Sequence, residues 1–390
     1  MRAPAGPRVV VAGYLVRCPL GGFAWQLAHF LVGLRALGCR VFFYEDSAFD
    51  AKAFVPGARG GDVYRRGAVL AARFLAAHGL DQQWSFHDAA ADRWFGSGRD
   101  AAGTALADAD LFVNLGGVNR VPRDARPRAI SAYLDFDPGV TQARLAAGDR
   151  ALDVLVGEHD HLFTLGERIG LPGCGVPTAG RTWHPLRQPV VAELWEPLPV
   201  DASASFTTIG TWDVEGRDVL VAGETFTWRK RTEWLRFLEL PQRTGARFRM
   251  AMNLDHHPDD RRRLEAHGWE VVDPIALSAD PDRYRAFIRA SRGEFTTAKD
   301  INVRLRSGWF SDRAACYLAA GRPVVTQDTG FAEMLPTGHG LHAFRTIEEA
   351  AGAIACVVGD YEREIVAARD LARAHFAPSE TLAPLLALAR

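Results

Sequence analysis

The sequence predicts an α/β protein built from two doubly wound domains that face each other across a cleft. Its 390 residues are more than one hydrophobic core normally uses. Short apolar runs, rich in β-branched and aromatic residues, alternate with helical segments in both halves of the chain. Between the halves, the stretch 174–199 contains five prolines, which is typical of a linker.

The first half begins with a strand over 8–14, whose lack of polar alternation is typical of a strand buried on both faces. A loop with two glycines leads to a helix that ends at Gly38, and a second strand over 40–46 completes a βαβ unit. We expect the crossover of this unit to be right-handed. A helix is then predicted over 63–79, with strands over 110–117, 128–137 and 161–170.

The second half repeats this alternation of strands and helices. Strands are predicted over 206–212, 248–253, 269–274, 293–298 and 323–328. Helices are predicted over 229–239, 259–267, 281–290, 312–320 and 347–376. This order assigns residues 1–198 to a first domain, 199–375 to a second, and 376–390 to a C-terminal helix that can cross back to the first. Ligands are expected in the cleft, at the carboxyl ends of the strands.

Composition and charge exclude several classes of function. The net charge of −1 provides no basic face for nucleic acid, and no apolar run reaches the roughly 18–20 residues that span a membrane. The N-terminus becomes strand-like too early for a signal peptide. The five cysteines are scattered and form no C-x-x-C pair, which predicts reduced thiols in a cytoplasmic protein, with neither a disulfide framework nor a metal site.

Lysine is rare in this chain: of 46 basic residues only Lys52, Lys230 and Lys299 are lysines. A coding preference for arginine explains most of this bias. Where arginine is the default, however, a lysine can mark a position that needs a compact point charge, such as a phosphate contact. Lys230 and Lys299 both follow predicted strands of the second half, where a ligand is expected.

Two segments of the chain carry a resemblance to known enzymes. A strand, a Gly-Gly loop and a helix lead into LRALGCRVFFYE (34–45), and LAAGRPVVTQDTGF (318–331) lies in the final third. Both are similar to motifs of the GT-B glycosyltransferases, especially the family-four-like retaining enzymes. The resemblance implies two Rossmann-like domains, an N-terminal one for the acceptor and a C-terminal one for the nucleotide-sugar. It also implies a metal-independent enzyme without a cofactor, in which the nucleotide-sugar is a co-substrate.

The donor side of such an enzyme must neutralise a departing diphosphate. Gly21 and Gly22 lie between a strand and a helix, where a bare backbone can approach a ligand, although a Gly-Gly pair can also be a simple tight turn. The resemblance places Arg229 and Lys230 on the diphosphate; the alternative for this pair is a solvated basic turn. Lys299 is a further candidate, because it directly follows a predicted strand.

The donor segment also departs from the pattern of the family. The family carries two glutamates at positions where this chain has Gly308 and Cys316. Asp312 lies one helical turn before Cys316 on the same face, so it is the nearest substitute for the ribose-binding acid, although it can equally cap the helix. Residues at strand ends complete the expected donor site: Asp273, Gln327, Asp328, Thr329 and Gly330.

The acceptor side needs a group that orients or deprotonates the incoming hydroxyl. Asp135 and Asp137 end a predicted strand at a spacing of two, so both are expected on one face, where either could act as base or hydrogen-bond the acceptor. The alternative for Asp137 is a role in an Asp-Pro turn. Further acceptor contacts are expected from Arg17, Glu45, His159 and His161.

The sequence therefore predicts a glycosyltransferase that moves a sugar from a nucleotide donor to a small hydroxylated acceptor, with retention of configuration favoured by the resemblance. Two alternatives stay open. One is a sugar-nucleotide epimerase of the same fold, which would need acid and base groups around the donor sugar. The other is a binding protein that has kept the cleft without catalysis, and the missing carboxylates are its best evidence.

Overall fold

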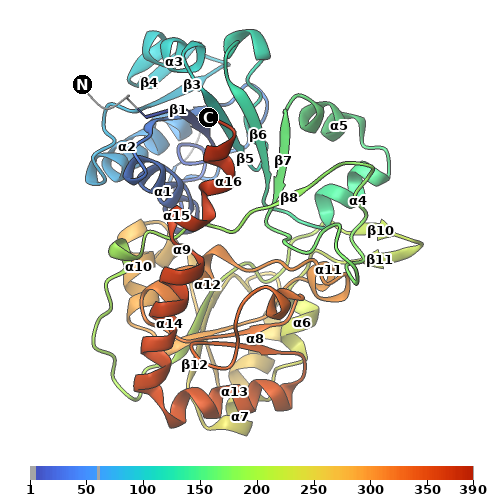
Figure 1. Ribbon diagram of the computed structural model, residues 1–390. Helices are drawn as coiled ribbons and strands as arrows, with labels where there is room; N and C mark the ends of the chain where they lie inside the picture. Colours follow the sequence, from blue (N-terminus) through green and yellow to red (C-terminus); the bar gives the residue numbers. More distant parts are fainter. Residues whose placement is uncertain (1–5, 59–61, 390) are drawn as a thin grey trace.

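The computed structural model describes residues 6–58 and 62–389, which form two parallel sheets covered by helices (Figure 1). Within this part of the chain the first sheet has eight strands, in the order β4-β3-β2-β1-β5-β6-β7-β8. Every neighbouring pair is parallel except β3 and β4. The strands are β1 (Arg8–Ala12), β2 (Arg40–Asp46), β3 (Trp84–Asp88), β4 (Arg93–Gly96), β5 (Leu111–Leu115), β6 (Ile130–Asp135), β7 (His161–Thr164) and β8 (His184–Pro185).

The central strands of this sheet are buried along almost their whole length, as the continuous apolar runs predict. Every residue of β5 is buried, because helices cover both faces of a parallel sheet. The helix after β1 is apolar around most of its circumference, since it contacts both the first sheet and helices of the C-terminal half. The helices are α1 (Gly21–Ala36), α2 (Val63–Ala77), α3 (Gly98–Ala107), α4 (Val140–Ala146) and α5 (Arg150–Gly157).

The second sheet, as far as the structure describes it, has six parallel strands in the order β13-β12-β9-β14-β15-β16. The strands are β9 (Phe206–Gly210), β12 (Phe248–Met252), β13 (Trp269–Val272), β14 (Gly293–Thr296), β15 (Val324–Gln327) and β16 (Leu341–Phe344). The helices are α6 (Arg231–Leu235), α7 (Leu240–Thr244), α8 (Pro258–Ala266), α9 (Pro274–Ser278), α10 (Pro281–Arg289), α11 (Asp300–Arg304), α12 (Asp312–Ala319), α13 (Ile347–Gly359) and α14 (Tyr361–His375). An aromatic core that includes Trp234, Phe248 and Phe295 fills one side of this sheet.

Several elements differ from the sequence prediction. The expected helix over 229–239 is the short α6, with α7 beginning only at Leu240. The expected helix over 347–376 is divided into α13 and α14 at Asp360, whose backbone leaves the helical region. Several elements have no counterpart in the prediction. Among the strands these are the β3–β4 hairpin, β8, the edge strand β16, and a small hairpin of β10 (Val219–Val221) and β11 (Glu224–Phe226). Among the helices they are α3, α4, α5, α7, α9 and α11.

The two sheets are joined by the proline-rich stretch and by the C-terminal helices. The 3-10 helix η3 (Ala192–Trp195) lies in the linker and contacts α12. After α14, the helices α15 (Pro378–Thr381) and α16 (Ala383–Ala387) return to the first domain, and α15 contacts α1 (Figure 1). Among the described helices, none has both the length and the apolar character that a bilayer crossing requires.

Candidate functional site

The topological switch points of the two sheets mark where a ligand is expected. In the first sheet β1 and β5 are neighbours, and the chain continues from β1 toward one edge of the sheet and from β5 toward the other. In the second sheet the same holds for the neighbours β9 and β14. The loops at the two switch points meet: Asp137, after β6, lies 3.0 Å from the Arg217 guanidinium after β9 and 4.0 Å from Lys299 Nζ after β14. The carboxyl ends of both sheets therefore border one cleft.

Lys230 is a buried cation that faces the Trp309 ring, 5.8 Å from its Nζ, and has no carboxylate partner among the described residues. It directly precedes α6, its residue is 6% exposed, and its Nζ forms no hydrogen bond or ion pair with any described residue. Burial lowers the pKa of Lys230 well below its ordinary value, and the charges of Arg313 and Lys299 lower it further, against Glu294 and Asp312. A buried, uncompensated ammonium is costly, so this position is prepared for an anion.

Lys299 lies on the opposite side of the same switch point, directly before α11. Its Nζ lies 2.8 Å from the centre of the Trp228 ring and 4.0 Å from Asp137 Oδ1. Burial lowers the pKa of Lys299 to about 7, and the nearby carboxylate of Asp137 opposes this shift. Lys299 therefore changes charge close to neutral pH, and an anion beside it would favour its protonated form.

Arg229 differs from Lys230 because its charge is already compensated. Its Nε lies 3.7 Å from Asp213 Oδ1 and 3.6 Å from Asp218 Oδ2. On the other side, Arg231 forms an ion pair with Asp260. Of the two residues predicted to contact a diphosphate, the structure thus favours Lys230.

Gly308, at the first position where the resembling family has a glutamate, has no room for a side chain. Its φ is +77°, and an added Cβ would lie 2.8 Å from the backbone nitrogen of Arg168. Arg168 is fixed there because its N–H donates to the carbonyl of Ser307 over 3.0 Å. An acidic side chain does not fit at position 308, because the segment after β7 packs against this turn.

Cys316, at the second of these positions, belongs to the contact between the halves of the protein. The residue is buried on α12, and its Sγ lies 3.6 Å from Nε2 of His29 on α1. The same histidine accepts a hydrogen bond from the backbone N–H of Val191 over 3.0 Å and lies 3.0 Å from Nε1 of Trp195. A glutamate at this position would bury its charge in an apolar contact, away from any ligand.

Asp312 is the carboxylate that this segment retains. It lies in the first turn of α12, half-buried, with its Oδ2 3.5 Å from Nε2 of Gln26 on α1. Burial raises the pKa of Asp312, and the charges of Arg313 and Lys230 oppose this. The Ser311 side chain does not cap α12, whereas the N–H groups of Asp312 and Arg313 favour the ionised Asp312 carboxyl, so a role at the helix N-terminus and a ligand contact both stay predictions for Asp312.

Asp135 and Asp137 have different environments, although they lie two residues apart. Asp135 is buried and accepts hydrogen bonds from Thr141 Oγ1 (2.7 Å), Gln142 Nε2 (2.8 Å) and Thr164 Oγ1 (2.9 Å). Burial raises its pKa to about 6. These hydrogen bonds hold the turn after β6 in place, and a role of Asp135 toward the acceptor stays a prediction. Asp137 lies beyond the end of the strand, with 41% of its side chain exposed to the cleft.

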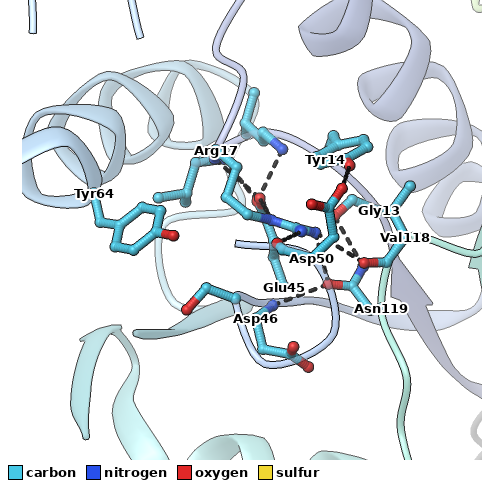
Figure 2. Close-up of polar contacts among 12 residues, drawn as sticks. Gly13, Tyr14, Arg17, Glu45, Asp46, Asp50, Tyr64, Val118 and Asn119 are labelled. Carbon is cyan, nitrogen blue, oxygen red and sulfur yellow. Dashed lines mark hydrogen bonds and ion pairs between the residues drawn. The ribbon is translucent and has the colours of Figure 1, made fainter. Parts of the chain in front are cut away.

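Arg17 and Glu45 form a buried ion pair (Figure 2). Both side chains are fully buried, with Arg17 Nε 2.9 Å from Glu45 Oε1. Glu45 also accepts N–H hydrogen bonds from Leu15 and Val16, over 2.8 and 2.6 Å. Arg17 donates to Asn119 Oδ1 over 3.0 Å. The pair ties the segments that follow β1 and β5 to the end of β2, and acceptor contacts of Arg17 and Glu45 stay a prediction.

Two residues that the sequence reasoning missed, Tyr14 and Asp50, lie at the edge of this cluster (Figure 2). The hydroxyl of Tyr14 donates to Asp50 Oδ2 over 2.7 Å, and the carbonyl of Asp50 accepts from the Arg17 guanidinium. The position of Tyr14, shortly after the first strand, was the available signal. The sequence held no comparable signal for Asp50, because the position of its loop depends on a contact with the buried Arg17.

His159 and His161 lie at the end of the sheet opposite the cleft. His161 begins β7 and pairs with Ala132 of β6, so both histidines are near the amino ends of parallel strands, whereas the cleft is at the carboxyl ends. His159 Nδ1 is 2.9 Å from the carbonyl of Leu155, and burial lowers the pKa of His159 to about 4. The structure thus places both histidines away from the cleft, and their acceptor roles stay predictions.

Gly21 and Gly22 begin α1, but the first of them is explained by packing. A Cβ at Gly21 would lie 2.4 Å from Cβ of Tyr284 on α10, so only glycine allows these helices to approach so closely. At Gly22 the nearest atom would be the Tyr284 hydroxyl, 3.8 Å away, which leaves space. A role of the α1 N-terminus in binding a diphosphate stays a prediction.

The remaining predicted donor residues form hydrogen bonds or ion pairs that fix the loops around them. Asp273 caps α9 by accepting from the Ile275 N–H over 2.7 Å. At the end of β15, Gln327 accepts from the Ala298 N–H over 3.1 Å, and Asp328 pairs with Arg345 over 2.7 Å. Thr329 donates to the carbonyl of Trp309 over 2.6 Å, and the Gly330 N–H donates to Asp328 over 2.8 Å. Direct ligand contacts of these residues stay a prediction.

A cavity of about 660 Å³ lies between the loops of the first switch point and the loop after β9. Its wall consists of Tyr14, Phe23, Gln26, Leu27, Phe49, Asp50, the stretch 115–118, Tyr133, Phe136, Asp137, Val140, Thr141, Arg144, Ala151, Leu152, Leu155 and the stretch 216–219. Asp137 belongs to this wall and also contacts Lys299, so the cavity adjoins the lysine side of the cleft. Within residues 6–58 and 62–389, no group of three or more His, Cys, Asp or Glu residues is placed to hold a metal ion.

Comparison with solved structures shows the fold. No protein-family model matches the chain, and no curated protein matches it either. AviGT4, a glycosyltransferase involved in avilamycin A biosynthesis, is 13% identical with a TM-score of 0.52, over 98% of this chain and 97% of that one. Anabaena HepE in complex with UDP and glucose is 12% identical with a TM-score of 0.55, over 97% and 98% of the two chains.

An alpha-glucosyltransferase in complex with UDP and a 13-mer DNA is 10% identical to this chain, with a TM-score of 0.56 over 99% of this chain and 100% of that one. These similarities extend over both domains and the linker between them. They establish that the chain has the GT-B fold, as the sequence predicted.

Proposed function

We propose that the protein is a glycosyltransferase that moves a sugar from a nucleoside-diphosphate donor to a hydroxylated small-molecule acceptor. The GT-B fold supports the class of reaction. The observation that carries the assignment to this cleft is the buried Lys230, whose ammonium faces the Trp309 ring but has no hydrogen-bond or ion-pair partner among the described residues. A diphosphate is an anion of the charge and size that such a site would bind.

The surroundings of Lys230 support a donor site and not a structural ion pair. The neighbouring arginines in the sequence, Arg229 and Arg231, both have carboxylate partners, and the buried Arg313 is paired with Glu294. Lys230 is different, and it lies at the switch point where this fold binds ligands. A diphosphate would therefore meet a positive charge that folding has left uncompensated.

In the proposed reaction, the acceptor oxygen forms a bond to the anomeric carbon while the bond from that carbon to the diphosphate oxygen breaks. The electron pair leaves with the diphosphate, whose growing negative charge Lys230 and Lys299 stabilise. The proton of the acceptor hydroxyl passes to the departing diphosphate. Asp137, on the wall of the cavity, orients that hydroxyl as a hydrogen-bond acceptor.

We further propose that the configuration of the sugar is retained and that no metal ion takes part. The loop after β1, residues 13–20, contains neither an acid nor a histidine that could take a proton on the face opposite the leaving group. Two lysines at the switch point supply the positive charge that a divalent ion would otherwise bring to a diphosphate.

A nucleotide screen tests the proposal. We expect one of UDP, GDP, ADP and TDP to raise the melting temperature of the protein, and the matching sugar donor to be consumed in the presence of an acceptor. Absence of stabilisation by all four would overturn the proposal. Stabilisation with an epimerised donor and no need for an acceptor would assign an epimerase instead, and stabilisation without any product would assign a binding protein.

A further inference from the structure

The cavity beside Asp137 indicates the chemical class of the acceptor. Building on the proposed function, we propose that the acceptor is an aromatic molecule with a hydroxyl group, whose ring packs between the aromatic side chains of the cavity wall. The cavity measures about 660 Å³, which is in the range of small-molecule sites, roughly 300–1,000 Å³.

Five aromatic side chains line this cavity: Tyr14, Phe23, Phe49, Tyr133 and Phe136. They come from the loops after β1, β2 and β6 and from the body of β6 and α1, so distant parts of the first domain contribute to one apolar wall. Aromatic rings pack favourably against one another in offset and edge-to-face geometries. Such a wall accommodates a ligand that contains an aromatic ring.

Two of these rings are exposed although they are large and apolar. Phe23 is 39% exposed and Phe49 is 44% exposed, and both belong to the wall of the cavity. Their surface is therefore not used to fill the core of the domain. Exposed apolar surface in a concave site marks a binding surface, because a ligand that covers it removes it from water.

The rest of the wall argues against a sugar or a nucleic acid as acceptor. Leu152, Leu155 and Val219 extend the apolar surface, and polar side chains of the wall are engaged within the protein: Asp50 accepts from Tyr14, and Thr141 donates to Asp135, so fewer of them are left to pair with the hydroxyl groups of a saccharide. The arginines of the wall are not free for phosphates: Arg144 pairs with Asp149 over 2.6 Å and Arg217 with Asp137 over 3.0 Å. An aromatic acceptor with one hydroxyl group near Asp137 needs neither many polar partners nor a free arginine.

The chain offers a matched pair of variants for the test. Phe49 and Phe54 lie in the same loop and are similarly exposed, at 44% and 50%, but only Phe49 lines the cavity. The probe is 4-methylumbelliferone, a fluorescent hydroxycoumarin, and the polar comparison is methyl α-D-glucopyranoside. Binding of each is measured to the full-length protein, saturated with the nucleotide that stabilises it best.

We expect 4-methylumbelliferone to bind at least ten-fold more tightly than the glucoside, and Phe49→Ala to weaken its binding about ten-fold. Phe54→Ala should change it less than two-fold, and neither variant should alter nucleotide affinity. Tighter binding of the glucoside, or equal loss in both variants, would overturn the proposal. Failure of every nucleotide to bind would contradict the proposed function instead. In that case the comparison of Phe49→Ala with Phe54→Ala, made on the protein without nucleotide, would still test the cavity.

Discussion

Two buried groups of charged residues lie at the carboxyl ends of the two sheets, and they are balanced in different ways. In the first domain, Arg17 and Glu45 neutralise each other and their polar atoms have further partners (Figure 2). In the second domain, Lys230 is buried against the Trp309 ring and has no described hydrogen-bond or ion-pair partner. A paired buried charge fixes the backbone around it, whereas an unpaired one costs stability until a ligand arrives. Scaffold and binding site can thus be distinguished by how their charges are compensated.

Removing one member of the compensated pair should have the largest effect on stability. Arg17→Met leaves the carboxylate of Glu45 buried without its cation, which we expect to lower the free energy of unfolding by about 3–5 kcal/mol. Equilibrium urea unfolding measures the change. The control is Arg99→Met, which removes an arginine from an exposed pair with Asp92 and should change little.

A second variant separates the loss of the pair from the loss of packing. In Arg17→Met combined with Glu45→Gln, no buried charge is left without a partner, so part of the stability should return. If Arg17→Met behaved like Arg99→Met, or if the double variant were no more stable than the single one, the distinction between the two groups of charges would fail.

Removing the uncompensated charge should act in the opposite direction on stability and strongly on function. Lys230→Met keeps the length of the side chain and removes the buried ammonium, so we expect the melting temperature of the free protein to rise. We also expect kcat/KM for the sugar donor to fall by about 10²–10³, the usual effect of removing one group that stabilises developing charge.

Lys52, the third lysine, provides the matched control for that experiment because it is exposed. Lys52→Met should leave both the melting temperature and the nucleotide-induced shift unchanged. A lower melting temperature for Lys230→Met, together with an unchanged shift on adding nucleotide, would show that Lys230 is structural.

The charge of Lys299 should make nucleotide binding depend on pH. Burial lowers the pKa of Lys299 to about 7, so the ammonium that attracts a diphosphate is lost as the pH rises through that value. Affinity should decrease above about pH 7, by up to about ten-fold per pH unit. Isothermal titration calorimetry across pH 6–9 measures this, and Lys299→Met should flatten the profile; equal slopes in both proteins would exclude Lys299 from the site.

The stability of the free protein should have the opposite pH dependence from its affinity for nucleotide. Unfolded, Lys299 keeps its proton up to about pH 10.5, whereas in the folded protein it loses it near pH 7. Unfolding therefore takes up a proton between these values, and the contribution of Lys299 to the free energy of unfolding rises with pH in that window. Below about pH 7 the full cost of the buried ammonium is present.

The fold was predictable from the sequence because it depends on local patterns. Runs such as the one in β5, buried along its whole length, identify strands of a parallel sheet without any knowledge of their neighbours. The hairpin of β10 and β11 was missed, and each of its strands is only three residues long. Such short strands depend on their partners more than on their own sequence.

The site was predictable only where a single residue type carried the signal. The rarity of lysine pointed to Lys230 and Lys299, and both lie at the switch point of the second sheet. The sequence could not separate Asp135 from Asp137, since the partner Thr164 that occupies Asp135 comes from another strand. Likewise, the reason for glycine at 308 is a contact with Arg168, which lies in the other half of the chain.

Asp312 offers the smallest and sharpest test of how far the donor segment departs from the family it resembles. Its carboxylate is half-buried opposite Gln26 of α1, and the positions of the two missing glutamates are occupied by contacts with Arg168 and His29. If Asp312 holds the ribose hydroxyls, Asp312→Asn should weaken nucleotide binding about five- to ten-fold, or roughly 1 kcal/mol, the usual net worth of one hydrogen bond, because asparagine can still accept from a hydroxyl with its amide oxygen.

Asp273→Asn is the control for Asp312→Asn, because Asp273 caps α9 with its side chain and asparagine caps a helix equally well. Nucleotide affinity should be unchanged in that variant. Since burial raises the pKa of Asp312, acidification should protonate the wild-type carboxyl and reduce its affinity toward that of Asp312→Asn. If Asp312→Asn bound nucleotide as tightly as the wild type at every pH, α12 would serve as framework alone, and Lys230 and Lys299 would be the charged side chains still proposed to contact the donor.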